Sequence, residues 1–127
     1  MPLKICLLVT DDPDDHQAFS EAISDISEKA IVLIILDSHK ALELLKAKQQ
    51  SPDYLFLDLS MHGIRINSFL KVLKQDLVLG SVPTLVYGEE LSLSKIEDRA
   101  NLIFFSKEYE YSALKKFLKE FIREDVD

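Results

Sequence analysis

The chain has 127 residues, 47% of them hydrophobic and 29% charged, which is enough for one compact domain with a real core but not for two. Its net charge of −7 would repel phosphate-rich partners, so we expect no nucleic-acid binding. No hydrophobic run approaches the ~20 residues of a membrane-spanning helix, and the start of the chain does not resemble a secretory signal. Cys6 is a lone cysteine inside an apolar run, which suits a reducing compartment. We therefore expect a cytoplasmic protein with no membrane contact.

The first half of the chain predicts two strand–helix pairs. Apolar runs at Ile5–Val9 and Ile31–Leu36 are continuous rather than alternating, which is typical of strands buried on both faces. The helix between them has an apolar stripe at Phe19, Ala22, Ile23, Ile26 and Ala30. A second helix carries Ala41, Leu42 and Leu45 and follows Asp37-Ser38, which resembles an N-terminal cap.

The second half repeats this pattern three times. Further apolar runs predict strands at Tyr54–Leu57, Val82–Tyr87 and Leu102–Phe105. Helical stripes follow the first and the last of these strands: Ile66, Phe69, Leu70, Leu73 and Leu77, and then Leu114, Phe117, Leu118, Phe121 and Ile122. The segment Leu91–Ala100 has the weakest helical pattern, with Ile96 and Ala100 on one face. We see no linker or repeat, and we expect residues 1–127 to form a single domain that ends in a charged tail.

Five strands alternating with helices predict an α/β fold with a doubly wound parallel sheet and helices on both faces. At this length the natural strand order is 2-1-3-4-5, which is the flavodoxin-like arrangement. The order reverses between strands 1 and 3, and ligands of such sheets bind beside the reversal, at the carboxyl ends of the strands. The residues after Val9 and at the end of Tyr54–Leu57 are therefore the expected site.

Acidic residues occupy both of these positions. Strand 1 is followed by Thr10-Asp11-Asp12-Pro13-Asp14-Asp15, and strand 3 by Asp58-Leu59-Ser60. Converging carboxylates repel each other unless a cation neutralises them, and hard oxygen ligands of this kind suit Mg²⁺. A phosphate-binding turn would instead need Gly, Ser or Thr after strand 1. The three histidines (His16, His39 and His62) follow no zinc-binding spacing, and we expect them at the surface.

The individual acids have different expected roles. Asp12 precedes a proline, so it is either the N-cap of the first helix or a metal ligand, and the sequence leaves both open. We expect Asp14 and Asp15 to complement the dipole of the first helical turn. Asp11 has no capping role, which favours metal binding. Asp58 ends an apolar strand, where a carboxylate without a partner would be costly, so we expect it to be functional.

These residues resemble the receiver domain of two-component response regulators over nearly the whole chain. The resemblance is carried by Leu7–His16, by Pro52–Met61, by Val82-Pro83 and by Lys107. It implies that Asp58 accepts a phosphoryl group from a histidine kinase or phosphotransfer protein. It also implies a Mg²⁺ ion held by Asp58, by Asp11 or Asp12 and by the backbone carbonyl of Ser60. Lys107 would pair with the phosphate oxygens, and Phe104 is either the family's aromatic switch residue or plain core.

Several positions depart from the family pattern. Thr10 replaces the first acid, and His62 and Glu108 replace prolines. Gly88 stands where the family has a phosphate-sensing Ser or Thr, and Glu89 and Glu90 follow it. The stretch before Lys107 is about three residues short in the region of the fourth helix, and an alignment without this deletion places Ser106 at the lysine position.

Three functions compete. The first is a phosphorylatable receiver without an output domain, which acts by binding or relaying to another protein as a monomer or weak dimer. The second is a degenerate receiver that serves as a phosphorylation-independent interaction module, as Gly88 and Glu108 suggest. The third is an aspartate-nucleophile phosphatase of the haloacid dehalogenase type, which would need an acid where Ser60 stands. We expect the first, and hence no enzyme beyond self-catalysed phosphoryl transfer and autodephosphorylation.

Overall fold

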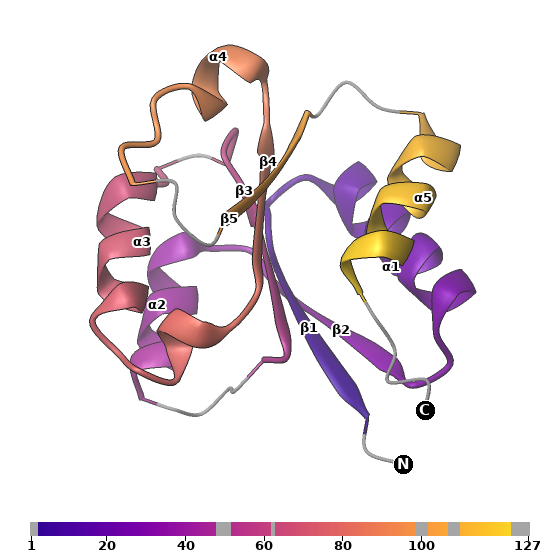
Figure 1. Ribbon diagram of the computed structural model, residues 1–127, viewed down its shortest axis with the longest axis horizontal. Helices are drawn as coiled ribbons and strands as arrows, with labels where there is room; N and C mark the ends of the chain where they lie inside the picture. Colours follow the sequence, from indigo (N-terminus) through magenta and orange to yellow (C-terminus); the bar gives the residue numbers. More distant parts are fainter. Residues whose placement is uncertain (1–2, 48–51, 62, 99–101, 107–109, 123–127) are drawn as a thin grey trace.

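A computed structural model describes residues 3–47, 52–61, 63–98, 102–106 and 110–122. Its five strands form one parallel sheet in the order β2-β1-β3-β4-β5, which confirms the predicted topology (Figure 1). The strands are β1 (Lys4–Val9), β2 (Ala30–Ile35), β3 (Tyr54–Asp58), β4 (Thr84–Gly88) and β5 (Leu102–Ser106). The helices are α1 (Pro13–Ile26), α2 (Ser38–Lys46), α3 (Ile66–Lys74), α4 (Glu90–Leu93) and α5 (Tyr111–Phe121), with a 3₁₀ turn η1 (Leu79–Ser81) before β4.

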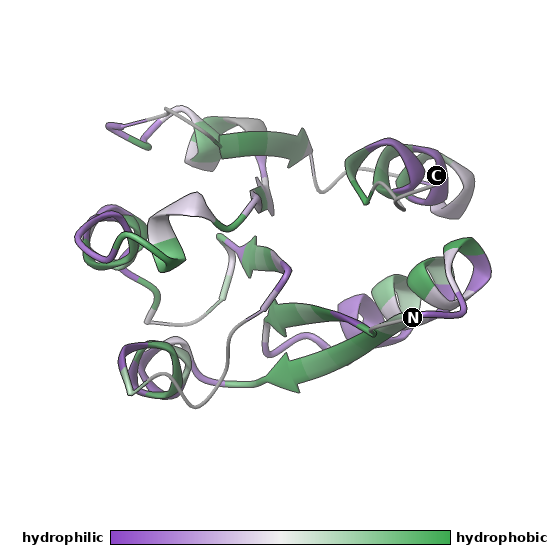
Figure 2. Ribbon diagram, turned by 60° about the horizontal axis from the view of Figure 1, so that its bottom comes forward, coloured by the Kyte–Doolittle hydropathy of each residue, from purple (hydrophilic) through white to green (hydrophobic). Residues whose placement is uncertain are grey.

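The helices cover the sheet from two sides. Helices α1 and α5 lie on one face, and α2 and α3 lie on the other (Figure 1). Because successive strand residues point to opposite faces, each strand contributes to two cores. Leu7, Leu55 and Val86 pack towards α2 and α3, whereas Leu8 and Phe56 pack towards α1 and α5. The strands are hydrophobic along their length, while the helices alternate between hydrophobic and hydrophilic faces (Figure 2).

The prediction that the strands are buried on both faces is correct only for the interior of the sheet. Strands β3 and β4 are buried at every residue, as is the second half of β1. The outer strands β2 and β5 leave Ile31, Ile34 and Ile103 exposed. Side chains of an edge strand have neighbours from another strand on one side only, so part of their surface stays in water.

Several predicted helix ends differ in the structure. Ala30 lies in β2 rather than in the first helix, because the chain is already extended at Ser27, the C-cap of α1. Leu77 is 94% exposed and lies beyond α3. There the Asp76 carboxylate accepts the amides of Val78 and Leu79, which starts the η1 turn instead of another helical turn.

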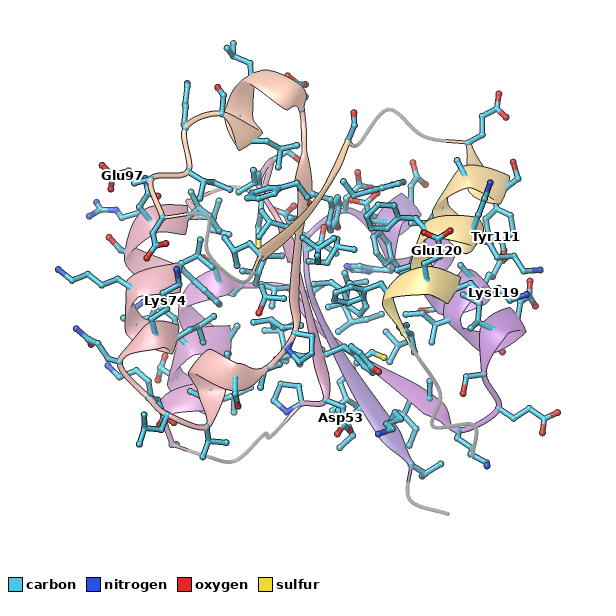
Figure 3. The ribbon with its side chains drawn as sticks, viewed as in Figure 1. Asp53, Lys74, Glu97, Tyr111, Lys119 and Glu120 are labelled. Carbon is cyan, nitrogen blue, oxygen red and sulfur yellow. The ribbon has the colours of Figure 1, made fainter. Side chains whose placement is uncertain are left out.

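Of the predicted helix over Leu91–Ala100, the part described, up to residue 98, contains only the single turn α4. Beyond it, the Asn67 side chain holds the chain against α3: its Nδ2 donates to the Lys95 carbonyl at 3.3 Å, and its Oδ1 accepts the Glu97 amide at 2.9 Å. Ile96 is nevertheless buried, as the apolar pattern predicted. Figure 3 shows Lys74 of α3 and Glu97 on this side of the molecule. Long-range hydrogen bonds to Asn67 therefore hold this segment in place of helical ones.

The Asp37 cap of α2 is confirmed, and it gives a stability prediction. Its Oδ1 accepts the amides of His39 at 2.7 Å and Lys40 at 3.2 Å. Asp37→Ala is expected to lower the free energy of unfolding by about 1 kcal/mol, because two helix amides lose their acceptor. Asp37→Asn is the matched control and should keep most of the stability. Urea denaturation checks this, and equal losses in both variants would contradict the cap.

Two expectations concerned the single cysteine and the absence of a membrane-spanning helix. Cys6 is fully buried as a free cysteine. Burial, together with the charge of Asp53, raises the pKa of its thiol to about 12, so the thiol remains protonated and unreactive. None of the helices formed by the described residues has both the length and the hydrophobicity to cross a membrane.

Candidate functional site

The candidate site lies at the carboxyl ends of β1 and β3, where the strand order reverses. Val9 is level with Leu57 in the parallel register of these two strands, which brings the next residues, Thr10 and Asp58, side by side. Thr10 and Asp58 are both completely buried. The topology therefore brings together the two chain segments that the sequence singled out.

Hydrogen bonds hold the Asp58 carboxylate on both of its oxygens. Oδ2 accepts the Thr10 hydroxyl at 2.6 Å. Oδ1 accepts the Ser60 amide at 2.8 Å and the Ser60 hydroxyl at 2.6 Å. Bonds to an ionised carboxylate are among the stronger ones in proteins, and they offset part of the cost of burying the charge. Thr10 thus stands in direct contact with Asp58, a role that the sequence analysis did not foresee.

The acids after β1 fall into two groups. Asp12 is the N-cap of α1, because its Oδ1 accepts the Asp14 amide at 2.9 Å. Of its two predicted roles, the structure shows the cap, and metal binding stays a prediction. Asp11 lies in the bend before Asp12 and is exposed, as is Asp14 in the first turn of α1. Asp11 therefore has a carboxylate accessible to a cation in solution.

Asp15 lies in the first turn of α1 with Asp14, as predicted, but the prediction did not foresee its burial. It is only 4% exposed, and its Oδ2 accepts the Tyr87 hydroxyl at 3.1 Å. The sequence did contain a signal for this burial. Asp15 precedes Phe19 by four residues, which places both on the inner face of α1.

Tyr87 links this acid to the sheet and lies opposite Asp58 in the β3–β4 register. Its ring is buried and packs on Phe19, with the ring centroids 4.9 Å apart. The pKa of the Tyr87 hydroxyl is raised, first by burial and then by the negative charge of Asp58. The phenol therefore remains protonated at physiological pH and acts as a hydrogen-bond donor.

His16, His39 and Asp53 lie outside this cluster of carboxylates. His16 is half-buried rather than at the surface, and its Nε2 donates to the Thr10 carbonyl at 2.8 Å, which braces the chain beside the site. His39 is exposed as predicted, and His62 lies outside the described residues. Asp53 accepts the Ile5 amide at 2.7 Å at the opposite, amino end of β3 (Figure 3).

The oxygen donors at this edge of the sheet are of the kind that Mg²⁺ prefers. Among the side chains that the structure describes, no group of three or more His, Cys, Asp or Glu residues is arranged to hold a metal ion. Mg²⁺ needs only one or two carboxylates, since it keeps several waters. Asp58, the exposed Asp11 and the backbone carbonyl of the exposed Ser60 supply hard oxygen donors of this kind. The chemistry of these donors suits Mg²⁺, and their role as ligands stays a prediction.

The positions where the family pattern places phosphate-binding and switch residues are described in part. Gly88 ends β4, where a Cβ would lie 2.8 Å from the Cβ of Leu59, so a side chain there is excluded by close packing. Phe104 is half-buried against the core beneath α2 and α3, and its role as an aromatic switch residue stays a prediction. Ser106, the alternative to Lys107, ends β5. Lys107 and Glu108 lie outside the described residues.

A scan against protein-family models found no match, and a search of curated proteins found none. Many solved structures do match. The chemotaxis response regulator CheY4 of Vibrio cholerae has a TM-score of 0.75 at 22% identity, covering 94% of this chain and 99% of that one. The phosphorylated cyanobacterial phytochrome response regulator RcpA gives 0.74 at 22% identity, covering 93% and 90%. The receiver domain of the Pseudomonas aeruginosa sensor histidine kinase PA1611, with a magnesium ion in its active-site cleft, gives 0.71 at 15% identity, covering 94% and 97%.

These likenesses define the class of fold. The chain has the fold of the response-regulator receiver domain, a flavodoxin-like doubly wound sheet with the predicted strand order. Within that fold, a buried aspartate ends the central strand and an exposed acid follows the first strand.

Proposed function

We propose that this chain is a receiver domain that accepts a phosphoryl group on Asp58 from the phosphohistidine of a histidine kinase or phosphotransfer protein. The observation that carries the proposal is the placement of Asp58. Its carboxylate is completely buried at the switch-point end of β3 and is held by hydrogen bonds from Thr10 and Ser60. Burying a charged carboxylate at the ligand-binding edge of the sheet costs free energy, which favours a functional reason for it. The two sets of hydrogen bonds hold this carboxylate in one orientation, as a nucleophile requires.

The phosphoryl transfer can be written with the residues present. A carboxylate oxygen of Asp58 attacks phosphorus, the phosphorus–nitrogen bond breaks, and the histidine nitrogen takes the bonding electron pair. Ser60 is exposed and donates to Oδ1, so its turn must move to admit the phosphorus. Asp58, Asp11 and the Ser60 carbonyl would hold Mg²⁺, which neutralises charge on the transferring group. Lys107 would then pair with the phosphate oxygens.

The proposal also includes the location, extent and partners of the domain. We propose a cytoplasmic receiver that spans residues 1–127, acts through a protein partner and has no enzyme activity beyond phosphoryl gain and loss. The net charge of −7 and the exposed acid beside the site support a protein partner rather than a nucleic acid. A monomer or weak dimer remains the expected state in solution.

Incubation with Mg²⁺ and acetyl phosphate tests the proposal. The protein is expected to gain the mass of one phosphoryl group by intact mass spectrometry, and chelation of the metal should prevent this gain. Absence of an adduct, together with absence of measurable Mg²⁺ binding, would overturn the proposal. The receiver fold would then serve as a phosphorylation-independent interaction module.

Asp11→Asn is expected to weaken the response to Mg²⁺. Removing the exposed carboxylate should raise the Mg²⁺ concentration for half-maximal phosphorylation by at least about tenfold, equivalent to about 1.4 kcal/mol of binding free energy. Asp14→Asn is the matched control, because Asp14 is an exposed acid three residues away in the first turn of α1. A Mg²⁺ titration of acetyl phosphate labelling measures both variants. Equal effects of the two substitutions would show that Asp11 contributes only to the overall negative charge near the site.

A further inference from the structure

A buried polar network lies behind Asp58, on the face of the sheet that α1 and α5 cover. Thr10, Asp58 and Tyr87 are 0% exposed and Asp15 is 4% exposed. Thr10 and Asp58 follow Leu8 and Phe56 by two residues, so all of them point to the same face of the sheet. A group of four polar residues enclosed by a hydrophobic core is held together by its own hydrogen bonds.

The Thr10 hydroxyl joins Asp58 to the start of α1. It donates to Asp58 Oδ2 at 2.6 Å and accepts the Asp12 amide at 3.2 Å. Asp12 is the N-cap of α1, and its carbonyl accepts the His16 amide at 3.1 Å. A change at Asp58 Oδ2 is thus two hydrogen bonds away from the first turn of this helix.

Tyr87 and Asp15 form a second connection to the same turn. Tyr87 is the β4 neighbour of Asp58, and its hydroxyl donates to Asp15 Oδ2 at 3.1 Å. One connection therefore starts at Asp58 and the other at its neighbour in β4, and both end in the first turn of α1.

Phosphorylation would change what Thr10 holds. The carboxylate carries a full negative charge, whereas an acyl phosphate leaves its carboxyl oxygens with much less. A hydrogen bond to the charged form is the stronger of the two. The Thr10 hydroxyl therefore stabilises unphosphorylated Asp58 more than the phosphorylated residue. It stabilises the transition state of phosphoryl transfer to an intermediate extent.

We propose that Thr10 is a positioning residue for Asp58, which biases it against the phosphorylated state, and that Thr10 and the Tyr87–Asp15 pair transmit phosphorylation of Asp58 to the first turn of α1. This inference rests on the proposed phosphoacceptor function. Loss of the phosphoryl group follows the same path in reverse. Water attacks phosphorus, the Asp58 oxygen–phosphorus bond breaks, and its electron pair returns to the carboxylate that Thr10 stabilises. The product is inorganic phosphate.

Thr10→Val and Thr10→Ser test the positioning role. Valine keeps the shape but has no donor, so the rate of labelling by acetyl phosphate should rise and the rate of phosphate loss should fall, each by about fivefold. Serine keeps the hydroxyl and should restore both wild-type rates. A purely structural role predicts no such opposite shift of the two rates. Equal rates in all three proteins would overturn the positioning role, whereas a wild-type protein that takes up no phosphate would overturn the proposed function itself.

Hydrogen exchange of the wild-type protein tests the connection to α1 without a substitution at Thr10. The amides of residues 14–16 are expected to exchange faster after phosphorylation, while those of α3 stay unchanged. Tyr87→Phe should abolish part of this increase. Tyr111→Phe is its matched control, because it removes a tyrosine–aspartate bond of 2.9 Å between α5 and α1 at the protein surface, to Asp25. Unchanged exchange in α1 of the phosphorylated wild-type protein would overturn this connection.

Discussion

Asp58→Asn is expected to abolish the phosphate adduct completely. An amide oxygen is too weak a nucleophile to attack phosphorus, and the amide carries no charge to hold a cation. The variant should still fold. Asparagine Oδ1 can accept the Ser60 amide and hydroxyl as Asp58 Oδ1 does. The new amide nitrogen, Nδ2, can donate to the Thr10 hydroxyl, which can accept as well as donate. Intact mass spectrometry after incubation with Mg²⁺ and acetyl phosphate measures the loss.

Asp12→Asn is the matched control for this experiment. It removes one carboxylate from the same edge of the sheet, but asparagine is an equally good N-cap and can still accept the Asp14 amide. If Asp12 acts only as the cap of α1, the variant keeps its adduct. An adduct that persists in Asp58→Asn would show that another carboxylate accepts the phosphoryl group. Loss of the adduct in Asp12→Asn alone would instead place Asp12 among the metal ligands.

Gly88→Ala is expected to destabilise the protein by about 1–3 kcal/mol through overpacking. The added Cβ would lie 2.8 Å from the Cβ of Leu59. Neither atom can rotate away, so the backbone must shift where the Leu59 amide donates to the Tyr87 carbonyl at 2.9 Å. Elsewhere, replacing glycine by alanine in a compatible conformation tends to stabilise a protein. The midpoint of urea denaturation measures the change.

Gly80→Ala is the control for this substitution. Its Cβ would find its nearest neighbour, the Leu73 carbonyl oxygen, at 3.4 Å, so its effect should stay within about 0.5 kcal/mol. A double-mutant cycle with Leu59→Gly isolates the clash. Alanine at position 88 should cost little once residue 59 has no Cβ. The same cost in both backgrounds would show that the close contact with Leu59 is not the reason for a glycine here.

The fold could be predicted from patterns of residues that are close together in the sequence. Continuous apolar runs and helical stripes are properties of neighbouring residues, and the alternation of strand and helix leaves few topologies open. The position of Asp58 followed from the same logic, because the end of a strand can be read along the chain. The helix ends were less predictable. Asp76 and Asn67 form side-chain hydrogen bonds to the backbone that end or replace helical turns, and composition alone does not reveal them.

By itself, the sequence determined the fold class, the strand order and the edge of the sheet where the acids gather. Only the tertiary structure decided which polar groups meet there. Thr10 and Asp58 are 48 residues apart in the chain, and Tyr87 and Asp15 are 72 apart. Each contact depends on strand register and on the face to which a side chain points. A threonine that seemed only a missing acid thus proved to be a direct hydrogen-bond donor to Asp58, and the first-turn acid Asp15 proved to be buried on the inner face of α1.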